Sequence, residues 1–176
     1  MEIDASLRAY HAQLGIPPDY SESTRLHFQP TPDNLVDIGL DCYGRPQKLR
    51  ADAATAWEAM RLAAANDSIE LLIVSAFRSP EYQVEVIRRQ LDIGKSIDDI
   101  LTRVAAPGFS EHHSGCALDL TTPGYEAVEE EFENSPAFTW LLAFAPIHGF
   151  LLSYPRNNPF GVTYEPWHWC FSSEVR

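Results

Sequence analysis

The chain has few cysteines, and their spacing is uninformative for metal binding. Only Cys42, Cys116 and Cys170 occur among its 176 residues, and no two of them have the Cys-x-x-Cys spacing. An odd number of cysteines without that spacing argues against a disulfide framework and against a cysteine-rich structural zinc site. We therefore expect three free thiols that behave as small buried residues.

Positive charge is also scarce. The chain has 13 lysines and arginines against 25 acidic residues, which gives a formal net charge of −12 at pH 7. Proteins that bind nucleic acid or anionic lipid through charge need clustered basic residues to face the phosphates. No such cluster is visible, so we expect neither nucleic acid nor a membrane surface among the partners.

A leader and a membrane-spanning segment are missing from the sequence as written. Residues 1–14 carry Glu2, Asp4 and Arg8 and have no apolar run of signal-peptide length. No stretch approaches the roughly 20 apolar residues of a membrane span. The sequence as written predicts a cytoplasmic protein, or a periplasmic one if a leader has been removed, and it assigns no oligomeric state.

Amphipathic helices and short apolar runs are present in alternation. In residues 50–65, Trp57, Met60 and Ala64 lie at helical spacing. Turn-forming residues in 16–48 predict loops or a hairpin there. Further helices are expected at 5–14, 80–91, 96–105, 125–132 and 136–147, and strands at 35–38, 69–76, 116–120, 150–154 and 167–171. Together they predict one α+β domain over 1–176, a small antiparallel sheet flanked by helices, with 1–48 as a less certain N-terminal extension.

Three residues are candidate metal ligands. His112 and Asp119 lie in the segment SEHHSGCALD, and His168 lies in the segment EPWH. Strand alternation places Asp119 on the face opposite Leu118 and Leu120, where a buried carboxylate needs a partner such as a metal. Imidazole and carboxylate suit zinc, with cobalt, nickel or manganese as alternatives, and three protein ligands leave a position open for water.

Two charged residues complete a hydrolytic site. Glu165, three residues before His168, is expected to take a proton from that water and to pass it to the leaving amine. Arg78 follows the 69–76 run, which we expect to form the central strand, and its guanidinium can hold a carboxylate or an oxyanion. Each signal alone is more typical of a surface pair, and it is their joint occurrence that indicates a hydrolase.

Three motifs in order carry a resemblance to a known family. They are Ser-x-x-Arg-Ser at 75–79, Ser-x-His-x-x-Gly-x-Ala-x-Asp at 110–119 and Glu-Pro-Trp-His at 165–168. Together they resemble the zinc D-alanyl-D-alanine carboxypeptidase family, which includes bacterial D,D- and L,D-carboxypeptidases and the vancomycin-resistance dipeptidases. The resemblance runs from Ile69 to Phe171.

The resemblance implies a fold, a substrate and a set of site residues. The fold is the small α+β fold shared with lysostaphin-type peptidases and the hedgehog signalling domain. The substrate is a peptide ending in D-alanine, from peptidoglycan or its precursors. The implied zinc ligands are His112, Asp119 and His168; the implied catalytic residues are Glu165 and Arg78; the implied substrate-binding residues are Arg78, Gln83, Ser110 and Ser114.

Two positions depart from the family pattern. His113 stands where glutamine or a small residue is expected, and Cys170 stands where arginine is expected. His113 has three open interpretations: it replaces His112 as a ligand, it hydrogen-bonds near the ligands, or it faces solvent. The spacing of His112 to Asp119 fits the family, so His112 is preferred.

Two other functions are alternatives to the carboxypeptidase. One is an endopeptidase that cuts within the peptidoglycan cross-bridge. The other is a non-catalytic zinc-binding module, as in the hedgehog domain. The presence of Glu165 and Arg78 favours an enzyme, because a purely structural zinc needs neither of them.

Overall fold

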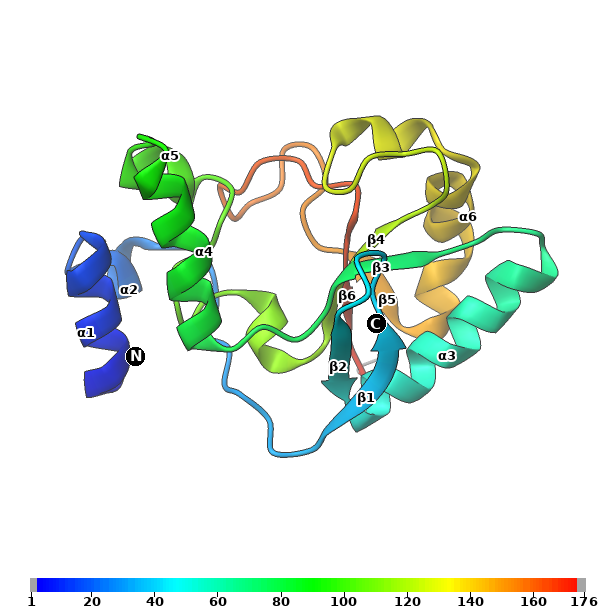
Figure 1. The fold of residues 1–176 in the computed structure, drawn as a ribbon, viewed down its shortest axis with the longest axis horizontal. Helices are drawn as coiled ribbons and strands as arrows, with labels where there is room; N and C mark the ends of the chain where they lie inside the picture. The colour runs from blue at the N-terminus through cyan, green and yellow to red at the C-terminus, as the bar shows by residue number, and fades with distance from the viewer. Residues whose placement is uncertain (1–2, 174–176) are drawn as a thin grey trace.

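A four-stranded antiparallel sheet lies near the centre of the molecule (Figure 1). The computed structural model describes residues 3–173. Within that range the sheet has the strand order β3-β4-β6-β5, and β1 and β2 form a separate antiparallel pair. The strands are β1 (Leu35–Leu40), β2 (Pro46–Arg50), β3 (Leu72–Ser75), β4 (Ala117–Thr121), β5 (Phe150–Leu152) and β6 (His168–Phe171).

Helices lie on both sides of this sheet, as the α+β prediction requires. In Figure 1, α3 and α6 lie on one side and α1, α4 and α5 on the other. None of the helices in residues 3–173 is long and apolar enough to cross a membrane. The helices are α1 (Ala5–Leu14), α2 (Tyr20–Ser23), α3 (Ala51–Asn66), α4 (Pro80–Asp92), α5 (Ile97–Leu101) and α6 (Pro136–Phe144), with short 3₁₀ helices η1 (Glu111–Ser114), η2 (Glu130–Asn134) and η3 (Ala145–His148).

Two helix starts follow directly from local sequence. The hydroxyl of Ser79 accepts a hydrogen bond from the amide of Tyr82 at 3.2 Å, and Pro80 occupies the first turn of α4. Ser135 accepts in the same way from the amide of Phe138 at 3.0 Å at the start of α6. Each serine satisfies an amide that has no partner within the helix, so both predicted starts are confirmed.

The predicted helix at 125–132 is wrong. Val128 has a positive φ of 56°, which a right-handed helix does not allow, and the segment forms turns followed by η2. Glu129, Glu130, Glu131 and Glu133 also lie close together, and like charges at helical spacing destabilise a helix.

Two other predicted helices are shorter than expected. The helix predicted to reach residue 147 ends at Phe144, because Pro146 cannot donate to the preceding turn, and η3 follows instead. The helix predicted to reach residue 105 ends at Leu101, where the Thr102 hydroxyl bonds back to the carbonyl of Asp99 at 2.7 Å.

The strand predicted to be central, β3, lies at an edge of the sheet. Its outer edge is covered by the β1–β2 pair and the turn between its strands. The amide of Cys42 donates to the carbonyl of Ile73 at 2.8 Å, and the Arg45 guanidinium donates to the carbonyl of Val74 at 3.0 Å. Because its outer edge is covered in this way, β3 can carry the apolar run that is typical of a central strand.

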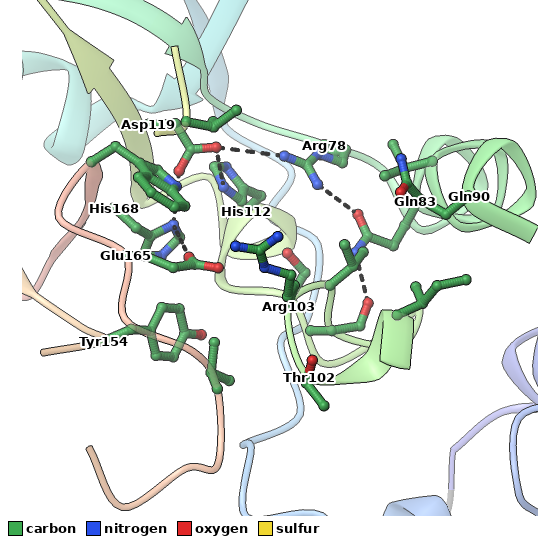
Figure 2. A pocket seen from close by; sticks show the side chains of 18 of the residues that line it. Arg78, Gln83, Gln90, Thr102, Arg103, His112, Asp119, Tyr154, Glu165 and His168 are labelled. Atoms are coloured by element: carbon green, nitrogen blue, oxygen red, sulfur yellow. Dashed lines mark hydrogen bonds and ion pairs between the residues drawn. The ribbon is translucent and has the colours of Figure 1, made fainter. Parts of the chain in front are cut away.

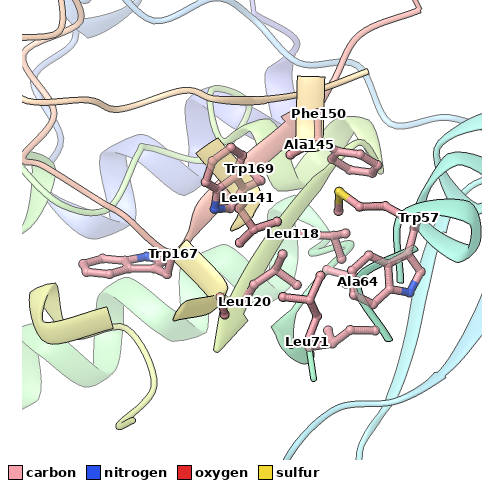
Figure 3. Close-up of a cluster of buried hydrophobic side chains, with 14 of the residues drawn as sticks. Trp57, Ala64, Leu71, Leu118, Leu120, Leu141, Ala145, Phe150, Trp167 and Trp169 are labelled. Atoms are coloured by element: carbon pink, nitrogen blue, oxygen red, sulfur yellow. The ribbon is translucent and has the colours of Figure 1, made fainter. Parts of the chain in front are cut away.

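The main apolar core lies between the sheet, α3 and α6 (Figure 3). Leu118 and Leu120 project into it from β4, together with Trp57, Leu141 and Trp169. A second apolar cluster joins α1, α4 and α5. The alternation predicted for the strand is therefore confirmed, because Leu118 and Leu120 share the core face and leave Asp119 for the opposite one.

The three cysteines are free, as expected, although they are not all buried. Cys116 is buried next to β4, Cys170 is partly buried in β6, and Cys42 is exposed in the turn after β1. The interpretation of Cys42 as a small buried residue is therefore wrong.

Candidate metal centre and active site

Strand pairing places two of the predicted ligands side by side. The register of β4 against β6 makes Asp119 and His168 direct partners, with Leu118 opposite Trp169 one residue earlier. Side chains of directly opposed residues project from the same face of a sheet. Asp119 and His168 therefore meet on the face that turns away from the main core.

The third predicted ligand, His112, comes from η1, immediately before β4. Gly115 ends η1 with a φ of 67°, and a Cβ there would lie 2.8 Å from a Leu35 methyl and 2.9 Å from the Arg50 amide nitrogen. Glycine is thus required at this turn, both for the positive φ and for the close approach. The turn sends the chain from His112 back into β4.

The three side chains form one buried cluster (Figure 2). His112 Nε2 lies 3.1 Å from Asp119 Oδ2, and His168 Nδ1 lies 2.9 Å from Asp119 Oδ1. One atom from each residue lies within 4.8 Å of the others. Ligand atoms of a tetrahedral zinc are separated by roughly 3.3 Å, so small adjustments of these side chains would accommodate the ion.

Hydrogen bonds indicate which ring nitrogens can bind a metal. His112 Nδ1 lies 2.6 Å from the carbonyl oxygen of Ala76, which can only accept, so Nδ1 carries a proton and Nε2 is the nitrogen available to a metal. His168 Nε2 lies 2.9 Å from a carboxylate oxygen of Glu111, which would keep a proton on Nε2 when a metal replaces the proton on Nδ1. His112 Nε2 and His168 Nδ1 are the ring nitrogens nearest Asp119.

The charges around the cluster favour a cation. Asp119, Glu111 and Glu165 bring three carboxyl groups together, and Arg78 supplies one guanidinium at 3.7 Å from Asp119. Burial would raise the pKa of Asp119, but the two imidazoles hold it well below its usual range. Burial lowers the pKa of His168, yet its hydrogen bonds to Asp119 and Glu111 raise it to about 10. Both shifts indicate a site that attracts positive charge, and its donor set fits zinc.

A cavity of about 630 Å³ opens in front of the three ligands. One wall is formed by Tyr154, which follows β5, and by Glu165, which precedes β6. The other wall comes from α4, α5 and the loop after α5, which contribute Gln83 and Arg103 (Figure 2). The cavity is large enough for a short peptide segment.

The predicted base, Glu165, is buried in this cavity. Its Oε2 lies 3.9 Å from His168 Nδ1, and its amide donates to the carbonyl of Tyr154 at 3.1 Å. The Tyr154 ring packs on the His168 ring with 4.9 Å between centroids. Burial raises the pKa of Glu165 to about 8, so this carboxyl group can both accept and donate a proton near neutral pH.

The Arg78 guanidinium lies beside the cluster, 3.7 Å from Asp119, and hydrogen bonds hold it in place. Its Nη1 donates to Gln83 Oε1 at 3.0 Å, and its Nη2 donates to the Ser75 hydroxyl at 3.2 Å. The Gln83 amide in turn donates to the carbonyl of Ala105 at 2.6 Å. Gln83 therefore orients the guanidinium and also lines the cavity.

The two predicted serines have different surroundings. Ser110 is buried and lines the cavity. The hydroxyl of Ser114 donates to the Glu111 carbonyl at 2.6 Å and accepts from the Cys116 amide at 3.2 Å, so it stabilises the turn and is not among the lining residues. Binding of substrate by Ser110, Ser114 and Gln83 stays a prediction.

His113 is fully buried, so the interpretation in which it faces solvent is wrong. Its Nδ1 donates to the Arg78 carbonyl at 2.6 Å, and it lies outside the cluster of three ligands. The Arg78 amide also donates to the His112 carbonyl at 3.2 Å. These bonds tie η1 to the segment that carries Arg78.

Three residues of the site were missed in the sequence. Glu111 directly precedes a predicted ligand, and that adjacency was the available signal. Tyr154 and Arg103 lie in loops with no motif around them, so no local signal pointed to them.

Comparisons with known proteins identify the family. A sequence model described as D-alanyl-D-alanine carboxypeptidase (VanY) matches residues 46–174. YodJ of Bacillus subtilis, named as a carboxypeptidase, is 31% identical over 149 residues, covering 81% of this chain and 54% of YodJ. A D-alanyl-D-alanine carboxypeptidase of Enterococcus faecalis is 29% identical over 117 residues, covering 61% and 42%.

Solved structures show the same fold. The LdcB LD-carboxypeptidase superposes with a TM-score of 0.71 at 30% identity, covering 80% of this chain and 69% of that one. A VanY D,D-pentapeptidase in complex with Zn(II) superposes with a TM-score of 0.62 at 24% identity, covering 83% and 84%. The α+β fold implied by the resemblance is confirmed.

Fold and buried cluster together define a protein of the metallopeptidase type. Because the family match extends over most of the sequence, the chain belongs to the VanY family of D-alanyl-D-alanine carboxypeptidases. The chain spans about half the length of YodJ and of the Enterococcus faecalis carboxypeptidase.

Proposed function

We propose that the chain is a zinc-dependent carboxypeptidase that releases a C-terminal D-alanine from peptidoglycan stem peptides or their precursors. The observation that carries this proposal is the buried cluster of His112, Asp119 and His168 opening onto a cavity that also contains Glu165 and Arg78. The names of the relatives, which include D,D- and L,D-carboxypeptidases, support the same substrate class.

The metal would be held by His112 Nε2, Asp119 and His168 Nδ1, whose atoms lie within 4.8 Å of one another and whose other ring nitrogens are held by Ala76 and Glu111. Bound there, zinc supplies a Lewis acid that polarises the scissile carbonyl and makes water more acidic. The buried apolar core behind β4 and β6 keeps Asp119 and His168 on rigid strands, which preserves their geometry during turnover.

Glu165 is placed to move the proton. It lies within 3.9 Å of His168 and faces the cavity, where the attacking water would lie. Its carboxylate takes the proton from water and then gives it to the amine of the departing D-alanine. Burial raises the pKa of Glu165 to about 8, so the protonated form is stable enough to act as the acid in the second step.

Two guanidinium groups serve the anionic parts of the substrate. Arg78 is fixed by Ser75 and Gln83 beside Asp119, so it is preorganised to stabilise negative charge on the carbonyl oxygen. Arg103 lines the same cavity on the loop after α5 (Figure 2). Its exposed position suits the free carboxylate at the end of the peptide, which distinguishes an exopeptidase substrate from an internal bond.

The experiment that tests this proposal is mass spectrometry of muropeptides incubated with the zinc-loaded protein. A pentapeptide ending in D-Ala-D-Ala, a tetrapeptide ending in D-Ala and a cross-linked dimer are offered side by side. Loss of one alanine from either peptide supports a carboxypeptidase and assigns it as D,D- or L,D-specific. Cleavage within a cross-linked dimer instead, or no cleavage while zinc is bound, would reject it.

A further inference from the structure

Glu111 has a carboxylate that contacts a metal ligand from the side opposite the metal position. We propose that Glu111 is a positioning residue that fixes the ring orientation and tautomer of His168. This inference rests on the proposed zinc site. It assigns a role to a residue that neither binds the metal nor reaches the substrate cavity.

The geometry at His168 is the first support. Its ring is held at both nitrogens, by Asp119 Oδ1 at 2.9 Å from Nδ1 and by Glu111 Oε2 at 2.9 Å from Nε2. Both carboxylates can only accept, so each ring nitrogen can carry a proton in the absence of a metal. When a metal between Asp119 and His112 replaces the proton on Nδ1, Glu111 keeps the other proton on Nε2 and so holds the ring in the tautomer that binds through Nδ1.

The anchoring of Glu111 is the second support. The Ser153 hydroxyl donates to the same oxygen, Oε2, at 2.6 Å. Glu111 begins η1, Ser153 follows β5, and His168 begins β6. The carboxylate thus joins three elements at one point, and a ring held by such a junction has little freedom to rotate.

The carboxylate of Glu111 also affects the strength of His168 as a ligand. Among the ion pairs of residues 3–173, the partner of Glu111 is His168. An ionised carboxylate behind an imidazole also makes its other nitrogen a stronger donor to a metal.

Removing such an outer carboxylate weakens metal affinity in other zinc sites by roughly 10- to 100-fold. We expect Glu111→Ala to weaken zinc binding by about this factor, because both the ring orientation and the tautomer become free. Glu111→Gln keeps an acceptor for Nε2 without the charge, so its zinc affinity should lie between that of Glu111→Ala and that of the unaltered chain.

The measurement is the zinc dissociation constant, obtained by competition with a chromogenic chelator at a temperature well below unfolding. A second readout is the ¹H–¹⁵N spectrum of the histidine rings in the zinc-loaded protein. The unaltered chain should show His168 protonated at Nε2, and Glu111→Ala should show a changed shift or faster exchange of that proton. Asp41→Asn is the matched control, since Asp41 is a buried carboxylate that has no contact with the cluster.

The outcomes separate this inference from the proposed function. The positioning role is supported if zinc binding is weakest in Glu111→Ala, intermediate in Glu111→Gln and strongest in the unaltered chain, while the control binds zinc as the unaltered chain does. Equal zinc affinity in Glu111→Ala and the unaltered chain, with both folded, overturns it. If the unaltered chain binds zinc but releases no alanine, the proposed function fails while the affinity comparison still decides the role of Glu111. If the unaltered chain binds no zinc, both fail.

Discussion

Two buried aspartates in this chain have similar burial but different surroundings. Asp41, in the turn that joins β1 and β2, is 6% exposed, and Asp119, in β4, is 5% exposed. Burying a carboxylate costs free energy unless hydrogen bonds or charges replace the lost water. The two residues meet this requirement in different ways.

Asp41 is satisfied by donors from its own neighbourhood. Its Oδ1 accepts from the amides of Tyr43 and Arg45, both at 2.9 Å. Its Oδ2 accepts from Arg45 Nε at 2.7 Å and from Gln47 Nε2 at 2.8 Å. The carboxylate has a full set of protein partners, so it has a structural role.

Asp119 instead faces two imidazoles, with His112 Nε2 at 3.1 Å and His168 Nδ1 at 2.9 Å. The guanidinium of Arg78 is 3.7 Å away, which is beyond hydrogen-bond distance. Burial therefore does not identify a functional carboxylate. The informative difference is the kind of partner: Asp41 accepts from amide and side-chain donors of its own turn, whereas Asp119 lies against two histidines that can share a metal ion with it.

The largest expected effect comes from removing a ligand beside Asp119. His168→Ala should reduce the zinc content from about one ion per chain to nearly none and abolish turnover, because two ligands hold zinc poorly. Metal analysis of the purified variant measures this. His27→Ala, an exposed histidine outside the cluster, is the control and should retain zinc. Full zinc content in His168→Ala would contradict the ligand assignment.

Glu165→Ala should lower turnover by about 10²- to 10⁴-fold while zinc stays bound. The reason is that Glu165 moves the proton but is not one of the three ligands. Steady-state rates of D-alanine release measure the loss of turnover, and metal analysis measures the zinc that stays bound. An unchanged rate would exclude Glu165 as the general base, and loss of zinc would show that it contributes to metal binding instead.

Asp41→Asn tests whether Asp41 has a structural role only. It should lower the free energy of unfolding by about 1–3 kcal/mol, because buried donors lose their charged acceptor. Zinc affinity and turnover per folded molecule should stay the same. Denaturant unfolding and zinc titration of the same preparation check this, and a change in zinc affinity would show that the two aspartates are coupled.

The same residue predicts a pH dependence. Burial would raise the pKa of Asp41, but hydrogen bonds from the Arg45 backbone and side chain lower it below the ordinary value. A carboxyl with a lowered folded pKa stabilises the protein above its unfolded pKa, near 4, and this stabilisation is lost as the pH falls through the folded pKa. Acid unfolding curves should therefore show a smaller stability loss below pH 4 in Asp41→Asn than in the unaltered chain.

The smallest expected effect is at Arg103. Arg103→Ala should raise KM for D-alanine release by roughly three- to tenfold with little change in kcat, because an exposed charge contributes modestly to binding. Arg89→Ala, an exposed arginine on α4 that does not line the cavity, is the control. A fall in kcat without a change in KM would place Arg103 in the chemical step and not in binding.

Much of the fold could be predicted because its signals are local. The serine caps of α4 and α6, the stripe on α3 and the alternation in β4 depend on neighbours within one or two turns. The segment around Val128 could not be predicted in this way, because its positive φ is imposed by the turn it makes. The edge position of β3 could not be predicted either, because the residues that cover its outer edge, Cys42 and Arg45, lie about 30 positions earlier in the sequence.

The amino-acid sequence by itself determined the chemistry: two imidazoles, a carboxylate, a general base and a guanidinium, in an order that resembles one family. Tertiary structure decided how they act together. Only the pairing of β4 with β6 sets Asp119 beside His168, and only the fold brings Glu111 and Ser153 behind that ring. The physical reason is that hydrogen bonding requires distances of about 3 Å and zinc coordination distances of about 2 Å, and residues some 50 positions apart reach those distances only through packing.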